Sequence, residues 1–392
     1  MQYRNITDGR LSALGLGGLR FPEQEGRPGI IDRKKAQPVV DAAISCGINC
    51  FDTAYSYQDG DSERFLGEAL AGYPRNEYLL STKFYVAYSE DIEAVFEEQL
   101  ERCRTDYFDF YMLHCLDEET IEPYMDEDRD YLCYLIRQKE AGRIRNIGFS
   151  SHAKTETLKR FLDWYDRFDM ALIQLNYLDW KLLDGCSQYE ILKEHNIPVW
   201  VMEPMKGGIL SALNEEAAGI LKAEAPSASI SSWGFRFLYS LDNVQTVLSG
   251  MSSVEQVKEN AELFDRLMSL DENEMKTLMK ASDVFIKGMG VPCSGCGYCR
   301  GLCPVGIDIP LMMKAFNEHS VGGETWKIEG LSCAVPASEC VSCGACVKRC
   351  PQNIQIPEFL ERFNLQETIV TVDAIGGCRR VIEAIETRGE AM

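Results

Sequence analysis

The strongest constraint on the fold is an alternation of short apolar runs with amphipathic helical patterns between residue 12 and about residue 266. Eight runs have the length and the β-branched or aromatic content of strands, and their near-continuous apolarity is typical of parallel strands covered by helices. They lie at residues 12–18, 48–53, 78–83, 108–114, 144–150, 171–177, 198–204 and 244–250. Eight strand–helix units predict an α/β fold of the (β/α)8 TIM barrel type. A doubly wound open sheet would give the same alternation and is the alternative.

A second feature begins near residue 290, where the composition changes abruptly. Eight of the 16 cysteines form two copies of the run C-x2-C-x2-C-x3-C-P. Such a run holds a cubane iron–sulfur cluster, because three closely spaced thiolates wrap one cluster while the fourth is directed away. The predicted metal ligands are Cys293, Cys296, Cys299 and Cys303, followed by Pro304, and Cys340, Cys343, Cys346 and Cys350, followed by Pro351.

The C-terminal segment resembles bacterial-type dicluster ferredoxins, which implies a small, mainly helical domain with two [4Fe-4S] clusters. In such ferredoxins the fourth cysteine of each run binds the other cluster, so Cys350 would join the first run and Cys303 the second. Structural zinc is the alternative, since thiolates also suit Zn²⁺, although zinc sites generally show two CxxC pairs. We expect a barrel at residues 1–287, a cluster domain at 288–365 and a tail at 366–392.

The charge balance excludes one class of partner. The chain carries 40 Lys and Arg against 61 Asp and Glu, a formal net charge of -21. Nucleic acids are bound by clustered basic residues, so we expect no nucleic-acid partner. The N-terminus lacks a signal-peptide pattern and no stretch of 18 uninterrupted apolar residues occurs, which predicts a cytoplasmic protein without membrane contact. The eight cysteines outside the two runs are expected to be packing or free thiols.

Polar side chains end three successive predicted strands. Asp52, Lys83 and His114 stand at these ends, and Tyr55 and Tyr57 follow the first. In a barrel of this type the C-terminal ends of the strands form the active site. A lysine ammonium beside a phenol lowers the phenol pKa, a carboxylate holds the lysine and an imidazole orients a carbonyl oxygen. The pattern therefore predicts a proton-transfer site.

Three segments, FDTAYSYQDGDSERFLGEAL, STK and LH, resemble the aldo-keto reductase family, and the resemblance runs from about residue 10 to 265. It implies an NAD(P)H-dependent oxidoreductase that interconverts carbonyls and alcohols. The family's catalytic tetrad falls on Asp52, Tyr57, Lys83 and His114. The resemblance makes Tyr57, rather than Tyr55, the general acid, with Lys83 tuning it, Asp52 anchoring Lys83 and His114 positioning the carbonyl.

The resemblance extends to the segments GFSSH, IQLNY, EPMKGG and SGMSSVEQVKEN, which match the family's nicotinamide and phosphate contacts. The implied cofactor-binding residues are Ser150, Ser151, Gln174, Glu203, Met205, Lys206, Gly207, Ser249, Gly250, Met251, Ser253, Gln256 and Asn260, with Asn176 beside them. Members that prefer NADPH carry an arginine four positions before Asn260, where this chain has Gln256. Loss of a bidentate arginine weakens phosphate recognition, so both NADP(H) and NAD(H) are kept as cofactors.

The two predicted chemistries do not couple directly, because a nicotinamide gives two electrons as hydride whereas each cluster carries one. The clusters would relay electrons from a ferredoxin-type redox partner, serve a bound flavin for which the chain has no sequence signature, or stabilise the fold. The leading interpretation is an iron-sulfur reductase acting on a small-molecule carbonyl or alcohol. The alternative is an electron-transfer protein whose barrel binds flavin or serves as a docking scaffold.

Overall fold

The computed structural model describes residues 1–7, 9–288, 290–320, 331 and 334–363. The chain divides into two compact units, Met1–Val284 and Phe285–Met392. The expected tail at 366–392 lies outside the described residues, as do Cys333 and Cys378.

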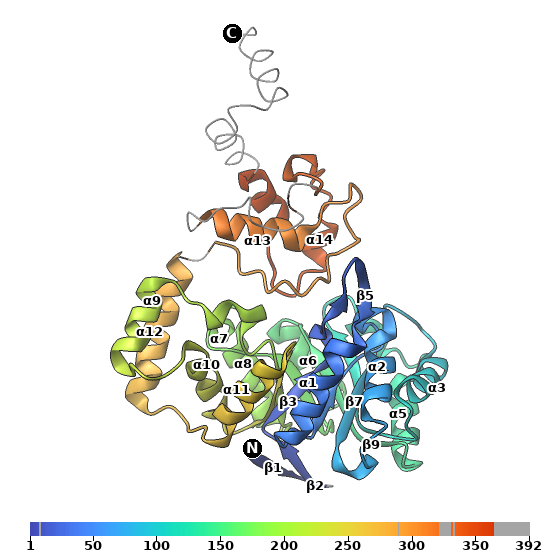
Figure 1. The fold of residues 1–392 in the computed structure, drawn as a ribbon. Coiled ribbons are helices and arrows are strands. Elements are labelled where there is room, and N and C mark those ends of the chain that lie inside the picture. The colour runs from blue at the N-terminus through green and yellow to red at the C-terminus, as the bar shows by residue number, and fades with distance from the viewer. Residues whose placement is uncertain (8, 289, 321–330, 332–333, 364–392) are drawn as a thin grey trace. The chain divides into compact units, whose positions relative to one another are not determined.

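In the first unit, eight parallel strands close into a barrel (Figure 1). Each strand pairs with the next one along the chain, and the last pairs with the first. The predicted (β/α)8 barrel is confirmed, and the alternative of an open sheet is wrong because no edge remains in this sheet. The strands are β3 (Leu14–Gly17), β6 (Cys50–Asp52), β7 (Leu79–Phe84), β8 (Phe108–Leu116), β9 (Ile144–Ser151), β10 (Met170–Gln174), β11 (Val199–Met202) and β12 (Val244–Ser249).

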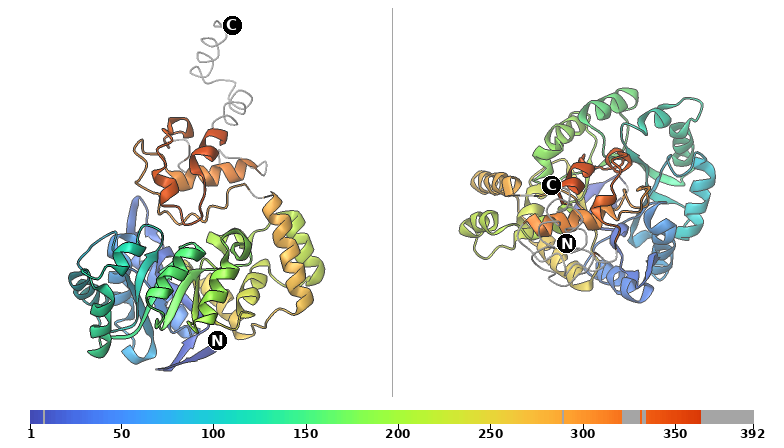
Figure 2. Two further views of the ribbon diagram at one scale, coloured as in Figure 1. Left: turned by 180° about the vertical axis from the view of Figure 1, so that it is seen from behind. Right: turned by 90° about the horizontal axis from the view of Figure 1, so that it is seen from above.

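Helices surround the strands as a ring, which Figure 2 shows from above. Each of these helices buries one apolar face. Phe65 and Leu66 of α2 (Asp61–Leu70), for example, are fully buried. The ring is formed by α1 (Arg33–Ser45), α2 (Asp61–Leu70), α3 (Ile92–Cys103), α5 (Tyr131–Glu140), α6 (Thr155–Trp164), α8 (Gly185–Glu194), α10 (Ile230–Tyr239) and α11 (Val254–Asp265). Further helices are α4 (Ile121–Met125), α7 (Asp179–Leu182), α9 (Glu215–Glu224) and α12 (Glu272–Gly288). Among the described residues, no helix has the length and apolarity needed to cross a membrane.

Two antiparallel hairpins were absent from the sequence prediction. The first, β1 (Tyr3–Ile6) with β2 (Gly9–Ser12), precedes the barrel and places Leu11 in a buried cluster with Phe110 and Trp200 from inside the barrel. It therefore covers the N-terminal ends of the strands and leaves the C-terminal ends for the site. The second, β4 (Glu23–Gln24) with β5 (Arg27–Ile31), extends the connection between β3 and α1.

The described part of the second unit is small and mainly helical, as predicted. It contains α13 (Ile309–Ser320), α14 (Ala345–Lys348), the 3-10 turn η7 (Ala337–Glu339) and a helical segment at residues 356–363. Its apolar core includes Val291, Ile307, Met313, Phe316 and Phe363. Several cysteines of both runs pack against this core, namely Cys293, Cys299, Cys303, Cys340, Cys346 and Cys350.

Candidate active site

The centre of the site is a buried ion pair between neighbouring strands. Asp52 is the last residue of β6, and Lys83 lies near the end of β7. The Lys83 Nζ donates to Oδ1 and Oδ2 of Asp52 at 2.8 and 2.7 Å, and to the backbone oxygen of Thr53 at 2.6 Å. Lys83 is fully buried, and these three acceptors use all three ammonium protons. A buried ion pair persists only when its polar atoms are satisfied in this way.

Tyr57 lies against this pair. Its side chain is buried, with 9% exposed, and the Lys83 Nζ lies 4.9 Å from the centroid of its ring. Burial, followed by the charges of Asp52, Cys115 and Glu203, raises the pKa of Tyr57 well above its ordinary value. The sequence had suggested the opposite direction, but here the Lys83 charge is compensated by Asp52. Tyr57 is therefore a neutral phenol that can give up a proton.

His114 completes the cluster of strand-end residues. Its ring lies edge-on to that of Tyr57, with 5.9 Å between centroids, and 5.1 Å from that of Tyr85. The buried Nδ1 of His114 has no hydrogen-bond partner among the described residues. Burial, aided by Lys83 and His152, lowers the pKa of His114 well below its ordinary value. A neutral imidazole at this position can donate to a carbonyl oxygen without a competing charge.

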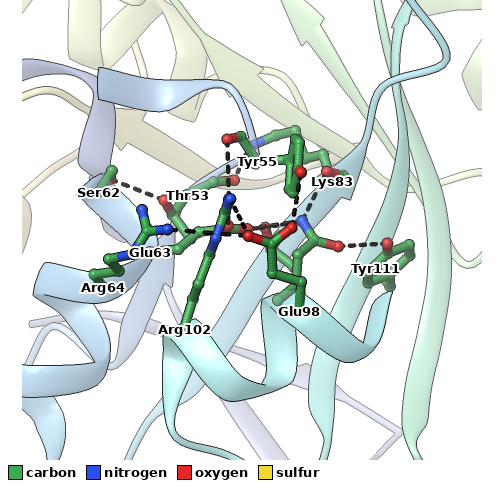
Figure 3. A network of polar contacts seen from close by, with 11 residues as sticks. Thr53, Tyr55, Ser62, Glu63, Arg64, Lys83, Glu98, Arg102 and Tyr111 are labelled. Carbon is green, nitrogen blue, oxygen red and sulfur yellow. Dashed lines mark hydrogen bonds and ion pairs between the residues drawn. The ribbon is translucent and has the colours of Figure 1, made fainter. Parts of the chain in front are cut away.

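Tyr55 points away from this cluster. Its Oη donates to Glu98 Oε2 at 2.8 Å, and the guanidinium of Arg102 lies 4.3 Å from its ring centroid (Figure 3). The two tyrosines of the loop therefore have different environments, and Tyr57 is the one brought together with Asp52, Lys83 and His114.

The side chains predicted to bind the cofactor at the ends of β9 and β10 form hydrogen bonds with β8, with the segment after β9 and with α7. The Ser150 Oγ accepts from the backbone N–H of Cys115 at 2.8 Å, and the Ser151 Oγ accepts from that of Ala153 at 3.1 Å. The Gln174 Nε2 donates to Asp179 at 2.8 Å. All three are buried at the C-terminal end of the barrel.

Lys206 forms a second buried ion pair. Its Nζ donates to Asp179 Oδ1 at 2.6 Å, and the two side chains are 1% and 0% exposed. The Asn176 Nδ2 donates to the other carboxylate oxygen at 2.7 Å. Sequence reasoning missed Asp179, although the acid three residues after Asn176 at the start of α7 was a visible hint. The pair joins the start of α7 to the loop after β11.

That loop is held in left-handed backbone geometry. Glu203, Lys206, Gly207 and Gly208 have φ values of 55, 46, 65 and 99°. Left-handed geometry is readily adopted by glycine and strained for other residues. Gly207 and Gly208 are exposed. The loop therefore exposes backbone groups rather than side chains to solvent. A surface that binds a ligand through backbone N–H groups requires this.

Arg20 is a further residue that sequence reasoning missed, although it stands two positions after Gly18, next to the end of β3. Its Nη2 lies 3.9 Å from Glu203 Oε1. A Cβ built on Gly250 would lie 2.5 Å from the Arg20 Cγ, so a side chain at this position would displace Arg20. Burial raises the pKa of Glu203, and Arg20 opposes this shift.

The segment after β12 begins α11. Ser249 and Met251 are buried, and the Ser253 Oγ caps the helix by accepting from the Gln256 N–H at 3.3 Å. The Gln256 Oε1 accepts from the Ser252 N–H at 2.8 Å, so its side chain folds back on the turn. Asn260 lies one turn further on and is half-buried.

The cysteine runs of the second unit form their own site. Cys293, Cys296, Cys299 and Cys350 line one cavity. Burial, followed by the proximity of the other three thiols, raises the pKa of Cys299 to about 12. Burial also raises the pKa of Cys346, with Cys340 and Cys343 as its thiol neighbours. In the described part of the chain, no three His, Cys, Asp or Glu side chains converge as ligands of a single ion. Four thiolates are the donor set that a [4Fe-4S] cluster takes.

Comparisons with known proteins assign a family to each part of the chain. Residues 13–283 match the model of the Aldo/keto reductase family, and residues 292–354 match that of a 4Fe-4S dicluster domain. An NADH-specific methylglyoxal reductase of Escherichia coli (strain K12) is 27% identical over 52% of this chain and 67% of its own. The uncharacterized oxidoreductase YqkF of Bacillus subtilis (strain 168) is 27% identical over 69% of this chain and 93% of its own. The structure of aldo-keto reductase AKR11C1 from Bacillus halodurans, holo form, aligns with a TM-score of 0.60 and 26% identity, covering 72% and 96% of the two chains.

Proposed function

Because the chain belongs to the aldo/keto reductase family, we propose that its barrel interconverts a small carbonyl compound and an alcohol, with NADH as the preferred cofactor. The single observation that carries this proposal is the buried group of Tyr57, Lys83 and His114 at the C-terminal ends of the strands. A buried phenol, a compensated ammonium and a neutral imidazole are the parts that carbonyl reduction needs.

In the direction of reduction, Tyr57 gives its proton to the carbonyl oxygen as a C–H bond forms at the carbonyl carbon. His114 donates a hydrogen bond to the same oxygen and fixes its position. The phenolate that remains on Tyr57 is close to Lys83. The positive charge of Lys83 offsets the negative charge of Asp52, which lowers the free-energy cost of forming the phenolate. Solvent then returns the proton, and the alcohol dissociates.

The residues of this chain fit a nicotinamide dinucleotide. When bound, its nicotinamide supplies the hydride to the carbonyl carbon or accepts it from the alcohol. The exposed backbone of Gly207 and Gly208 and the close approach of Arg20 to Gly250 support a contact with the diphosphate. The preference for NADH rests on Gln256, a neutral side chain turned toward its own helix cap. The relative from Escherichia coli is named as NADH-specific.

The second unit contains a 4Fe-4S dicluster domain. We propose two [4Fe-4S] clusters, one held by Cys293, Cys296, Cys299 and Cys350 and the other by Cys303, Cys340, Cys343 and Cys346. The shared cavity of the first four thiols supports this partition. Each cluster would carry one electron, so a one-electron donor of the ferredoxin type is the class of redox partner that fits this unit.

The test uses the full chain, purified without oxygen. Methylglyoxal, the substrate in the name of the Escherichia coli relative, and a panel of other small aldehydes and ketones are supplied with NADH or NADPH, and nicotinamide oxidation is measured. We expect turnover, with kcat/KM higher for NADH. Absence of turnover with every carbonyl, together with no calorimetric binding of either nucleotide, contradicts the proposal.

A further inference from the structure

A buried network of polar side chains lies behind the site and joins α2, α3 and β7 (Figure 3). Its hub is Glu63, which is fully buried. The Glu63 Oε1 accepts from Thr82 Oγ1 at 2.6 Å and from Gln99 Nε2 at 2.7 Å, and its Oε2 accepts from Arg102 Nη1 at 3.0 Å. A carboxylate buried without water costs several kcal/mol unless donors surround it, so each donor is needed.

One branch of the network holds the peptide that carries Lys83. Side chains alternate along a strand, so Thr82 faces the helices while Lys83 faces the barrel interior. The Gln99 Nε2 donates to the backbone oxygen of Lys83 at 3.0 Å and lies 3.1 Å from Thr82 Oγ1. The Tyr111 Oη donates to Gln99 Oε1 at 2.5 Å and fixes the amide from its other side. The end of β7 is therefore tied to Glu63.

The other branch holds the loop that carries Tyr57. The Arg102 guanidinium bridges Glu63 and Glu98, and it lies over the ring of Tyr55. The Arg102 Nη1 is also within 3.5 Å of the backbone oxygen of Tyr55. A Cβ on Gly60, at φ 82°, would lie 2.5 Å from the Arg102 Nη1. Arg102 therefore supports this loop at Tyr55 and at Gly60, on both sides of Tyr57.

We propose that Glu63 is a positioning residue for proton transfer, because it sets the loop of Tyr57 and the strand of Lys83 in register through Arg102, Thr82 and Gln99. This inference rests on the proposed function. Proton and hydride transfer need the reacting groups aligned, and a displacement of about 1 Å can cost about a hundredfold in rate. Among the described residues, no hydrogen bond or ion pair joins Glu63 to Tyr57 or Lys83. The charge of Glu63 acts on Lys83 only at a distance, where it opposes the lowering of the Lys83 pKa by burial. The positioning effect would pass through the backbone of the two segments.

A general stabilising role is the competing explanation, and the chain offers a matched control. Asp109, near the start of β8, is 1% exposed and accepts from Arg75 at 2.7 Å, Arg145 at 3.0 Å and the Leu80 N–H at 2.9 Å. It is a buried carboxylate bound by arginines like Glu63, but it lies at the opposite end of the barrel from the site. Asp109→Asn should lower stability without a specific effect on the site.

The experiment compares Glu63→Gln with Asp109→Asn in the full chain. Hydrogen exchange, read by mass spectrometry, is measured at residues 53–60 and 79–84, together with kcat and KM for methylglyoxal reduction. For Glu63→Gln we expect faster exchange in both segments and a kcat lower by about tenfold to a hundredfold at nearly constant KM. For Asp109→Asn we expect a comparable loss of thermal stability, unchanged exchange in residues 53–60 and an unchanged kcat.

A second variant separates stability from positioning. In Glu63→Gln/Arg102→Met the guanidinium that has lost its buried partner and keeps only Glu98 is also removed, so thermal stability should recover in part while kcat stays low. Recovery of kcat along with stability overturns the inference, as does wild-type exchange in both segments of Glu63→Gln. If the wild-type chain reduces no carbonyl, the proposed function fails, and the exchange comparison alone still decides whether Glu63 holds the two segments.

Discussion

The Lys83 ammonium lies 4.9 Å from the ring centroid of Tyr57 but directs its hydrogen bonds to Asp52 and Thr53. Because the lysine is compensated, Tyr57 keeps its proton, and its pKa is raised well above the ordinary value by burial. The acid form required for reduction therefore persists into alkaline solution.

This gives the first prediction, on pH. The kcat/KM of carbonyl reduction should show no fall on the alkaline side up to about pH 10, the ordinary pKa of a tyrosine. Alcohol oxidation needs the phenolate and should become faster as the pH rises over the same range. Steady-state pH profiles in both directions test this, and an alkaline fall in reduction with an apparent pKa below about 9 contradicts it.

The second prediction concerns cofactor choice. Gln256→Arg introduces a guanidinium at the first turn of α11, where a 2'-phosphate would gain a charged, bidentate partner. We expect the ratio of kcat/KM for NADPH over NADH to rise about tenfold, which corresponds to about 1.4 kcal/mol. Gln256→Lys is the control, since a point charge lacks the bidentate geometry and should give a smaller change. An unaltered ratio in Gln256→Arg would place the phosphate elsewhere.

Lys206 carries the third prediction. Its buried pairing with Asp179 makes it a structural ion pair, and breaking such a pair by removing one partner costs about 3–5 kcal/mol. Lys206→Met should therefore lower the free energy of unfolding by about this amount, whereas Lys222→Met, on the exposed face of α9, should leave it unchanged. Denaturant titration measures both. A stable Lys206→Met chain with a raised KM for NADH would instead support direct cofactor contact.

The fourth prediction tests the cluster partition. Each single variant, Cys293→Ser or Cys350→Ser, should reduce the iron content from about eight to about four per chain. The double variant of these two residues should still retain about four, because both bind one cluster, whereas Cys293→Ser/Cys303→Ser should lose nearly all iron. Iron and acid-labile sulfide analysis after anaerobic purification distinguishes these results. Zinc in place of iron would contradict the clusters altogether.

Much of the barrel could be predicted because its strands are buried on both faces and read as continuous apolar runs. The hairpin of β1 and β2 was missed, since its strands have four residues each and Leu11 is its only deeply buried apolar side chain. The residues at the strand ends could also be predicted. Asp52, Lys83 and His114 are charged or ionisable, and each stands at the end of an apolar run in the sequence.

The partners of these residues could not be read in the same way. Glu63 and Gln99 lie 36 positions apart on different helices, and each has the appearance of a solvent-exposed polar residue in its helical pattern. Burial of polar side chains depends on close packing between α2 and α3, where a Cβ on Gly67 would lie 2.4 Å from the Arg102 backbone oxygen. Only the tertiary structure brings such groups together.

The most direct test of the account is the activity of Tyr57→Phe. This change removes one oxygen from a buried ring and leaves the Lys83–Asp52 pair and the cysteine runs intact. We predict that carbonyl reduction falls by about 10²- to 10⁴-fold, while NADH binding and iron content remain at wild-type levels. Turnover within about threefold of wild type would contradict the central claim that Tyr57 moves the proton.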